Sequence, residues 1–145
     1  MAVSEKQFCT FYLDNHLFGI EVLDVQEIIR FQEMTRVPHA SQVIKGLINL
    51  RGQIVTAIDL RQRLNLAEST LNELPINIIV RTEDGSAVSF LVDDIGDVLE
   101  MSNDDYEEPP ETVQVVAKDL IKGIYKLKDR FLVILDTRKL LYIES

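Results

Sequence analysis

Apolar and polar residues alternate in short runs along most of the chain, which is typical of half-buried β-strands. The alternation is clearest over residues 8–14, and a second apolar run follows at 17–20 after Asn15 and His16, so this segment predicts a β-hairpin. Further runs of the same kind lie at 23–30, 46–50, 53–60, 76–81, 87–92, 95–101, 123–127 and 130–135. The pattern predicts a mostly β protein.

Turn-forming residues separate these runs. The segments 51–53, 83–86 and 128–130 combine Gly, Asp or Ser with flanking apolar strands and predict tight hairpin turns. Two short helices are also expected. Asp59 and Asp136 each precede an apolar pattern as N-cap residues do, so each predicts the start of a helix.

An internal repeat organises the chain. Residues 44–64 align without gaps onto 121–141 at an offset of 77, and seven of the 21 positions are identical. Upstream, residues 18–29 align onto 88–99 at an offset of 70. The identical pairs in the longer alignment are Ile44/Ile121, Lys45/Lys122, Gly46/Gly123, Leu50/Leu127, Asp59/Asp136, Arg61/Arg138 and Leu64/Leu141.

The repeat predicts two copies of one small β unit within a single domain that spans residues 1–145, with copies at approximately 8–70 and 76–143. A unit of about 70 residues has little core of its own, so we expect two β-barrels packed side by side that share apolar surface, with a groove between them. The chain has the option of crossing between halves, so the repeats need not coincide with the barrels.

Charge and composition limit the classes of partner and the location to be expected of this protein. The 145 residues contain 15 Lys and Arg against 24 Asp and Glu, a net charge of −9, which disfavours nucleic-acid binding. The N-terminal residues lack the order of a signal peptide, and no apolar run approaches the roughly 20 residues of a membrane span. We therefore expect a cytoplasmic protein that does not insert into the membrane.

Candidate catalytic groups are few. His16 and His39 fall in turns or loops without identifiable partners, Cys9 lies within a strand, and no glycine-rich phosphate loop is present. The cluster of Asp93, Asp94 and Asp97 leaves a metal-assisted hydrolase as an alternative function, although it lacks the spacing of a Ca²⁺ loop. We expect no cofactor and no catalytic residue.

The turn at Asn49, Leu50, Arg51 and Gly52 stands out, because the second repeat keeps the scaffold and changes the turn. Gly52 is suited to a positive φ, Asn49 to local backbone hydrogen bonds, and Arg51 is presented outward. The second copy has Lys128 and Asp129 in place of the arginine and glycine. Binding is a better explanation of this difference than structure alone, whereas we expect Gly46 and Gly123 to serve the backbone in both copies.

Several motifs together resemble the CheW-like family of chemotaxis coupling proteins. They are Val25-Gln26-Glu27-Ile28, Ile44-Lys45-Gly46, Asn49-Leu50-Arg51-Gly52 and Ile58-Asp59-Leu60-Arg61, followed by the segments 91–99 and 123–141. The resemblance covers nearly the whole chain. Thr56 departs from the family, which usually has a proline there.

The resemblance implies two SH3-like five-stranded β-barrels and a non-catalytic adaptor in two-component signal transduction. Its partners would be the regulatory domain of the histidine kinase CheA and the helical hairpin tip of a chemoreceptor, in receptor arrays at the inner face of the membrane. By matching motif positions, the resemblance places receptor contacts at Val25, Gly46, Asn49, Arg51 and Gly52. It assigns no residue to the kinase contact.

Overall fold

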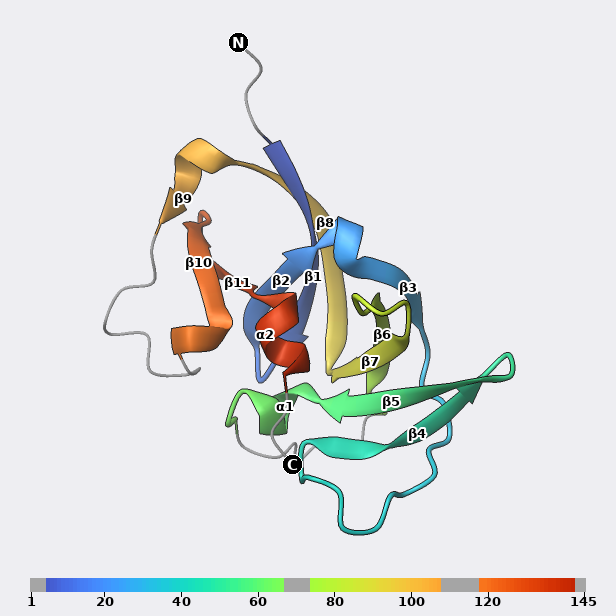
Figure 1. Cartoon of the computed structure of the whole chain (residues 1–145). Coiled ribbons are helices and arrows are strands. Elements are labelled where there is room, and N and C mark those ends of the chain that lie inside the picture. Colours follow the sequence, from blue (N-terminus) through green and yellow to red (C-terminus); the bar gives the residue numbers. More distant parts are fainter. Residues whose placement is uncertain (1–4, 67–73, 108–117, 143–145) are drawn as a thin grey trace.

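The computed structural model describes residues 5–66, 74–107 and 118–142, and within these ranges eleven strands form two sheets (Figure 1). One sheet has six strands in the order β8-β1-β2-β11-β10-β9, and the other has five in the order β3-β6-β7-β5-β4. The strands are β1 (Glu5–Leu13), β2 (His16–Glu21), β3 (Val25–Ile29), β4 (Ile44–Leu50), β5 (Gln53–Asp59), β6 (Ile76–Arg81), β7 (Ala87–Val92), β8 (Asp94–Ser102), β9 (Tyr106–Glu107), β10 (Ile121–Lys126) and β11 (Phe131–Leu135).

The helical elements are short. The α-helices are α1 (Leu60–Arg63) and α2 (Thr137–Leu141), and single 3₁₀ turns lie at Val22–Asp24, Asn103–Asp105 and Lys118–Leu120. The predicted mostly β class is therefore confirmed. In the part of the chain that the structure describes, no helix combines the length and the apolar character needed to cross a membrane.

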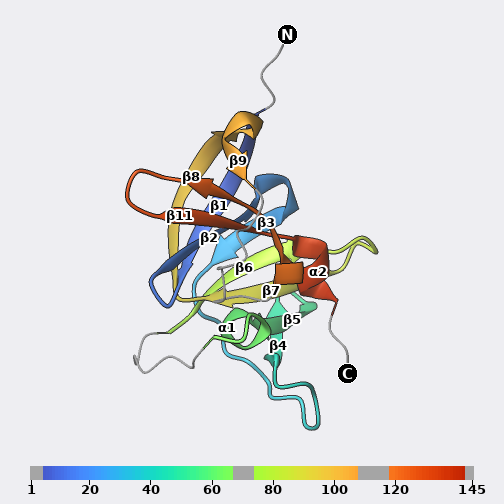
Figure 2. The same ribbon diagram turned by 90° about the vertical axis from the view of Figure 1, so that its left-hand side faces the viewer.

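The two halves of the chain exchange their hairpins. The β1-β2 hairpin lies between β8 and β11, whereas the corresponding β6-β7 hairpin lies between β3 and β5. The parallel contacts that join each hairpin to the other half share one register: Phe18 faces Val133 in one sheet, and Val88 faces Thr56 in the other. Phe18 and Val88 are 70 positions apart, and Thr56 and Val133 are 77 apart, so the two pairs join equivalent positions of the repeats. Each sheet thus contains strands from both repeats, and Figure 2 shows the sheets one above the other.

The two predicted barrel units are present as sheets of five and six strands, and neither sheet closes on itself. The strand orders are open, because β8 and β9 do not pair with each other across the first sheet, nor β3 with β4 across the second. The six-stranded sheet also gains β9, whose two residues are too few to show a periodic pattern. The join expected between the repeats, near residues 69–75, falls largely within 67–73, which lie outside the described residues.

Repeated glycines explain how each sheet curls. In both copies the ladder has a bulge before the glycine: between Ile44 and Gly46 in β4, and between Ile121 and Gly123 in β10. In each copy a second segment, which we call the crossing segment, packs directly on this strand: the residues around Thr35 on β4, and β9 on β10. Thr35 exchanges two 2.8 Å backbone hydrogen bonds with Leu47, and β9 pairs with β10 at the equivalent position. A side chain at either glycine would collide with the crossing segment, which confirms the predicted backbone role.

Three clusters of buried apolar side chains hold the molecule together. The central cluster draws on both sheets and includes Phe11 and Phe18, whose rings stack at 6.1 Å, together with Ile58 and Phe90. A smaller cluster lies inside each curled sheet, one around Ile48 and Val55 and the other around residues of β10 and β11. Because each fully buried aliphatic or aromatic side chain contributes about 1.5–3 kcal/mol, the central cluster binds the sheets into one body.

The two helices are fixed at both ends by polar contacts. As predicted, Asp59 accepts hydrogen bonds from the backbone N–H groups of α1, and Asp136 does the same for α2. Arg63 of α1 then reaches across to α2 and donates to its last backbone carbonyls, at 3.1 Å to Leu140, 2.7 Å to Lys139 and 2.9 Å to Tyr142. One arginine thus supplies donors to three carbonyls at the end of α2 and joins the repeats, and the Lys139 carbonyl also accepts the Tyr142 N–H at 3.3 Å.

The substitution Gly46→Ala should lower the free energy of unfolding by about 1–3 kcal/mol. A Cβ at this position would lie 2.8 Å from the Thr35 carbonyl oxygen and 2.9 Å from the Met34 Cβ, so the crossing segment must move. Urea denaturation measures the loss. Gly85→Asn is the matched control, because Gly85 has φ of +85° and open space around it, a setting that asparagine tolerates. Equal stability of the two variants would contradict the close approach.

The substitution Arg63→Ala should lower the free energy of unfolding by about 1–3 kcal/mol, since it removes the guanidinium donors from the Leu140 and Tyr142 carbonyls and one of two donors from the Lys139 carbonyl. Arg138→Ala is the control from the other helix. Arg138 pairs only with Glu83, at 2.6 Å, and both side chains are largely exposed, so its loss should cost under about 0.5 kcal/mol. Thermal unfolding of both variants compares them, and a cost at Arg138 as large as at Arg63 would refute this role.

Candidate functional site

The β4-β5 hairpin ends in a two-residue turn of Arg51 and Gly52 (Figure 1). Both residues have positive φ, 51° and 85°, which matches the right-handed twist of the flanking strands. The Asn49 side-chain oxygen accepts a 3.0 Å hydrogen bond from the Gly52 N–H. The predicted roles of Asn49 and Gly52 in the turn are confirmed. The arginine is held in a conformation that side-chain-bearing residues rarely adopt, and its guanidinium points outward.

An ion pair places this arginine next to β3. The Arg51 guanidinium donates to the Glu27 carboxylate, although β3 and β4 lie at opposite edges of their sheet. The Arg51 side chain is 67% exposed and that of Glu27 is 25% exposed. Hydrogen bonds from Arg51 and then from Gln26 hold the pKa of Glu27 below its usual value. An exposed pair adds little stability, so its effect is to fix where the positive charge lies.

The structure brings three of the five predicted contact residues together at the hairpin tip and places a fourth on the strand that Arg51 contacts. Asn49, Arg51 and Gly52 form the hairpin tip, and Val25 lies on β3, two residues from the Glu27 that Arg51 contacts. Val25 itself is half-buried against the central cluster. Gly46 is different: it is buried in β4 beneath Thr35 and Met34, so it offers no surface of its own.

Exposed apolar side chains lie on or next to the elements that carry the ion pair. Leu23, in the 3₁₀ turn before β3, is 93% exposed, and Ile28 on β3 and Ile54 beside the hairpin tip are also exposed. Large apolar residues exposed in this way on a folded protein often mark a contact surface when they cluster. We call Leu23, Glu27, Ile28, Arg51 and Ile54 the hairpin-edge surface. It offers one positioned cation together with exposed apolar groups.

Glu27 is the residue that sequence reasoning missed. It lies in a motif that carried the family resemblance, but no role was assigned to its carboxylate. Arg51 and Glu27 are 24 positions apart and on opposite edges of a sheet, so no local pattern joins them. The available signal was an acidic residue within a predicted strand, in the motif Val25-Gln26-Glu27-Ile28.

The second repeat has a turn at the equivalent position with different residues. It has the same length, because the Leu127 N–H donates 2.8 Å to the Arg130 carbonyl where Leu50 pairs with Gln53, and the two turn residues, Lys128 and Asp129, are exposed. Phe131 occupies the position equivalent to Ile54 and is likewise exposed. The two hairpins therefore share an apolar residue but differ in charge.

The acidic cluster of the alternative function does not form a metal site. Asp93 is occupied by Arg61, whose Nε lies 2.9 Å from its carboxylate, and it also accepts the Asp14 N–H at 2.9 Å. Asp94 accepts from the Ile95 backbone, and Asp97 is exposed. Across residues 5–66, 74–107 and 118–142 no group of three potential ligands is close enough to hold a metal ion. The hydrolase alternative is therefore unsupported.

The remaining candidate nucleophile and bases have no catalytic setting. Cys9 is buried in β1, and this burial raises the pKa of its thiol, which disfavours the reactive thiolate. His16 and His39 are both exposed, and among the described residues neither has an ion-pair or hydrogen-bonding side-chain partner. The chemistry that the described surface supports is recognition.

Comparisons with known proteins agree with the geometry. The family described as "CheW-like domain" matches residues 7–145. The chain is 33% identical over 146 residues to the chemotaxis protein CheW of Treponema pallidum, with 97% of this chain and 85% of that one covered. It is 34% identical over 140 residues to that of Klebsiella aerogenes (97% and 84% covered) and 35% over 140 residues to that of Bacillus subtilis (97% and 89%).

A solved structure is also similar. The crystal structure of the scaffolding protein TtCheW from Thermoanaerobacter tengcongensis superposes with a TM-score of 0.86 at 27% sequence identity. The match covers 99% of this chain and 92% of that one. The arrangement of two open sheets is thus shared along nearly the entire length.

The Asp93–Arg61 pair predicts a defined pH dependence. Burial acts to raise the pKa of Asp93, but the hydrogen bonds from Arg61 and the Asp14 N–H outweigh it and hold that pKa below its usual value. A lowered folded-state pKa means that the stabilisation is complete above the unfolded value of about 4 and is lost as the pH falls through the folded value.

The substitution Asp93→Asn should therefore destabilise the protein by about 1–3 kcal/mol at pH 7, with the difference from wild type shrinking below about pH 4. Urea denaturation between pH 7 and pH 2.5 measures it. Asp94→Asn is the control, since that carboxylate bonds only to its neighbouring backbone. A constant difference across the whole pH range would refute the role of the ionised pair.

Proposed function

Because the chain belongs to the CheW-like family, whose members are scaffold proteins and not enzymes, we propose that it couples chemoreceptors to the histidine kinase CheA. The partners are the cytoplasmic hairpin tip of a receptor and the regulatory domain of the kinase. The protein works in the cytoplasm, at receptor arrays on the inner face of the membrane, without entering the membrane itself.

The full chain acts as one CheW-like domain in this proposal. Support comes from the exchange of hairpins between the repeats, because neither half contains all the strands of either sheet. A coupling protein has to hold two partners in a constant relative position, and a body whose sheets share a central core is suited to that.

The observation that carries the receptor contact is the positioned Arg51. Its side chain is exposed and held by Glu27, and exposed apolar residues of the hairpin-edge surface lie on or next to the same elements. A receptor tip is a helical hairpin, and helices commonly bind through an apolar face with polar contacts at the rim. The contact residues in this proposal are Val25, Asn49, Arg51 and Gly52, while the buried Gly46 contributes by allowing the crossing segment to lie on β4.

Binding to a receptor cytoplasmic fragment should weaken about tenfold in the Arg51→Ala variant, because truncation of a central arginine commonly costs more than 1 kcal/mol. Binding to the CheA regulatory domain should stay within about twofold of wild type. Isothermal titration calorimetry with both partners, at physiological salt, gives the two values.

Lys128→Ala is the matched control, since it removes one positive charge from the equivalent turn of the other hairpin. Receptor binding that is unchanged in Arg51→Ala, or weakened as much by Lys128→Ala, would remove Arg51 from the contact. Failure of the wild-type protein to bind either partner would overturn the coupling function as a whole.

A further inference from the structure

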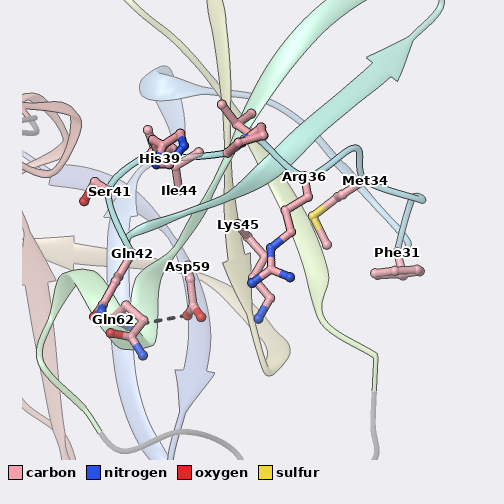
Figure 3. A pocket seen from close by; sticks show the side chains of 13 residues that line it. Phe31, Met34, Arg36, His39, Ser41, Gln42, Ile44, Lys45, Asp59 and Gln62 are labelled. Carbon is pink, nitrogen blue, oxygen red and sulfur yellow. Dashed lines mark hydrogen bonds between the residues drawn. The ribbon is translucent and has the colours of Figure 1, made fainter.

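A second surface lies at the other end of β4 from the hairpin tip. Here the segment between β3 and β4, the first residues of β4 and the start of α1 enclose an open cleft of about 950 Å³ (Figure 3). We call it the basic cleft. Its walls include Met34, Arg36, His39, Ile44, Lys45 and Asp59.

Backbone hydrogen bonds fix the shape of this cleft. On one side Thr35 is bonded to Leu47 of β4, as described above, and on the other the Ile44 N–H donates 2.9 Å to the Ser41 carbonyl. The Val43 N–H donates to the Ser41 hydroxyl, and the Asp59 N–H donates 2.8 Å to the Val43 carbonyl. The segment is therefore anchored to β4 at both ends, and the cleft is preformed.

Two cationic side chains line the cleft and have no anionic partner among the described residues. Arg36 and Lys45 come from different elements, and Figure 3 shows their side chains running in the same direction into the cleft. Neither has an ion-pair or hydrogen-bond partner among the described residues, whereas Arg51, Arg61 and Lys122 all pair with carboxylates. The facing Asp59 carboxylate is engaged in capping α1. A local positive charge thus remains on a protein whose net charge is −9.

The rest of the lining decides which kind of anion fits. Phosphate sites commonly offer converging backbone N–H groups, but here those of Ala40, Val43 and Ile44 are bonded within the segment itself. Half-buried Phe31, Met34 and Ile44 add apolar surface to the lining on either side of the cations (Figure 3). A nucleic acid would meet repulsion from the acidic remainder of the chain. Carboxylates with apolar neighbours match the lining better.

We propose that the basic cleft binds an acidic peptide segment of a partner protein. Carboxylates of the segment pair with Arg36 and Lys45, and apolar side chains on either side of them pack on Met34 and on Ile44. The site is separate from the hairpin-edge surface, since it lies at the opposite end of β4. It does not depend on Arg51.

Fluorescence anisotropy with a labelled peptide of about twelve residues, in which glutamate and leucine alternate, tests the proposal. The wild-type protein should bind it with a Kd below about 1 mM, and the double variant Arg36→Glu/Lys45→Glu should bind at least about tenfold more weakly. A peptide with glutamine in place of glutamate should also bind at least about tenfold more weakly, since it has no carboxylates.

The double variant Lys126→Glu/Lys128→Glu is the matched control. It changes the net charge equally but alters exposed lysines of the second repeat, so its binding should stay within about twofold of wild type. The Arg51→Ala variant should also bind the peptide like wild type, which separates this site from the receptor contact. Circular dichroism confirms that every variant is folded.

Amide NMR spectra locate the bound peptide. Shifts should concentrate at residues 34–45 and 59–62, and inorganic phosphate at equal concentration should leave them unmoved. The proposal is overturned if the wild-type protein does not bind the glutamate peptide, if the glutamine peptide binds equally, or if both charge-reversal variants weaken binding alike. Displacement of the peptide by phosphate would overturn it in favour of a small-anion site.

Discussion

The parallel pairing of β2 with β11 and of β7 with β5 joins the two halves of the chain, and the rest of the fold depends on it. Through these pairs each hairpin completes the sheet of the opposite repeat, and Phe18 and Phe90 reach a central core that both sheets share. Neither half therefore has a complete sheet or a complete core of its own, so the two halves should unfold together. The positions of the hairpin-edge surface and of the basic cleft follow from this arrangement, because both lie on strands that the exchange holds in place.

Features that depend on neighbouring residues could be predicted from the sequence. The strands at 76–81 and 87–92 have the bounds expected from alternation, and Asp59 and Asp136 cap helices because an N-cap acts within one turn. Features that depend on distant pairing could not. The openness of both sheets, the exchange of hairpins and the two-residue strand β9 are set by contacts between segments far apart in the chain.

In the candidate site, too, the local features could be predicted from the sequence and the long-range ones could not. The turn at Arg51 and Gly52 is a local structure, and the sequence indicated both its geometry and its outward charge. The contact with Glu27 and the lining of the basic cleft need the curled sheet, which brings β3, β4 and the segment between them together. In both repeats the glycine, Gly46 or Gly123, allows the same crossing, and the residue paired with the strand at the equivalent position is Thr35 in one copy and Glu107 in the other.

The hairpin exchange also constrains how such a chain can have arisen. A polypeptide with a single repeat would possess the hairpin of one sheet and the remaining strands of the other, so alone it would leave both unfinished. Two identical copies could complete each other, since the exchange is reciprocal and has the form of a two-fold symmetric dimer. Gene fusion would then make that dimer permanent, and it would release the two halves from the identity that symmetry imposes. Arg51 and Lys128, which occupy equivalent positions of the two turns, are an example of such a difference between the halves.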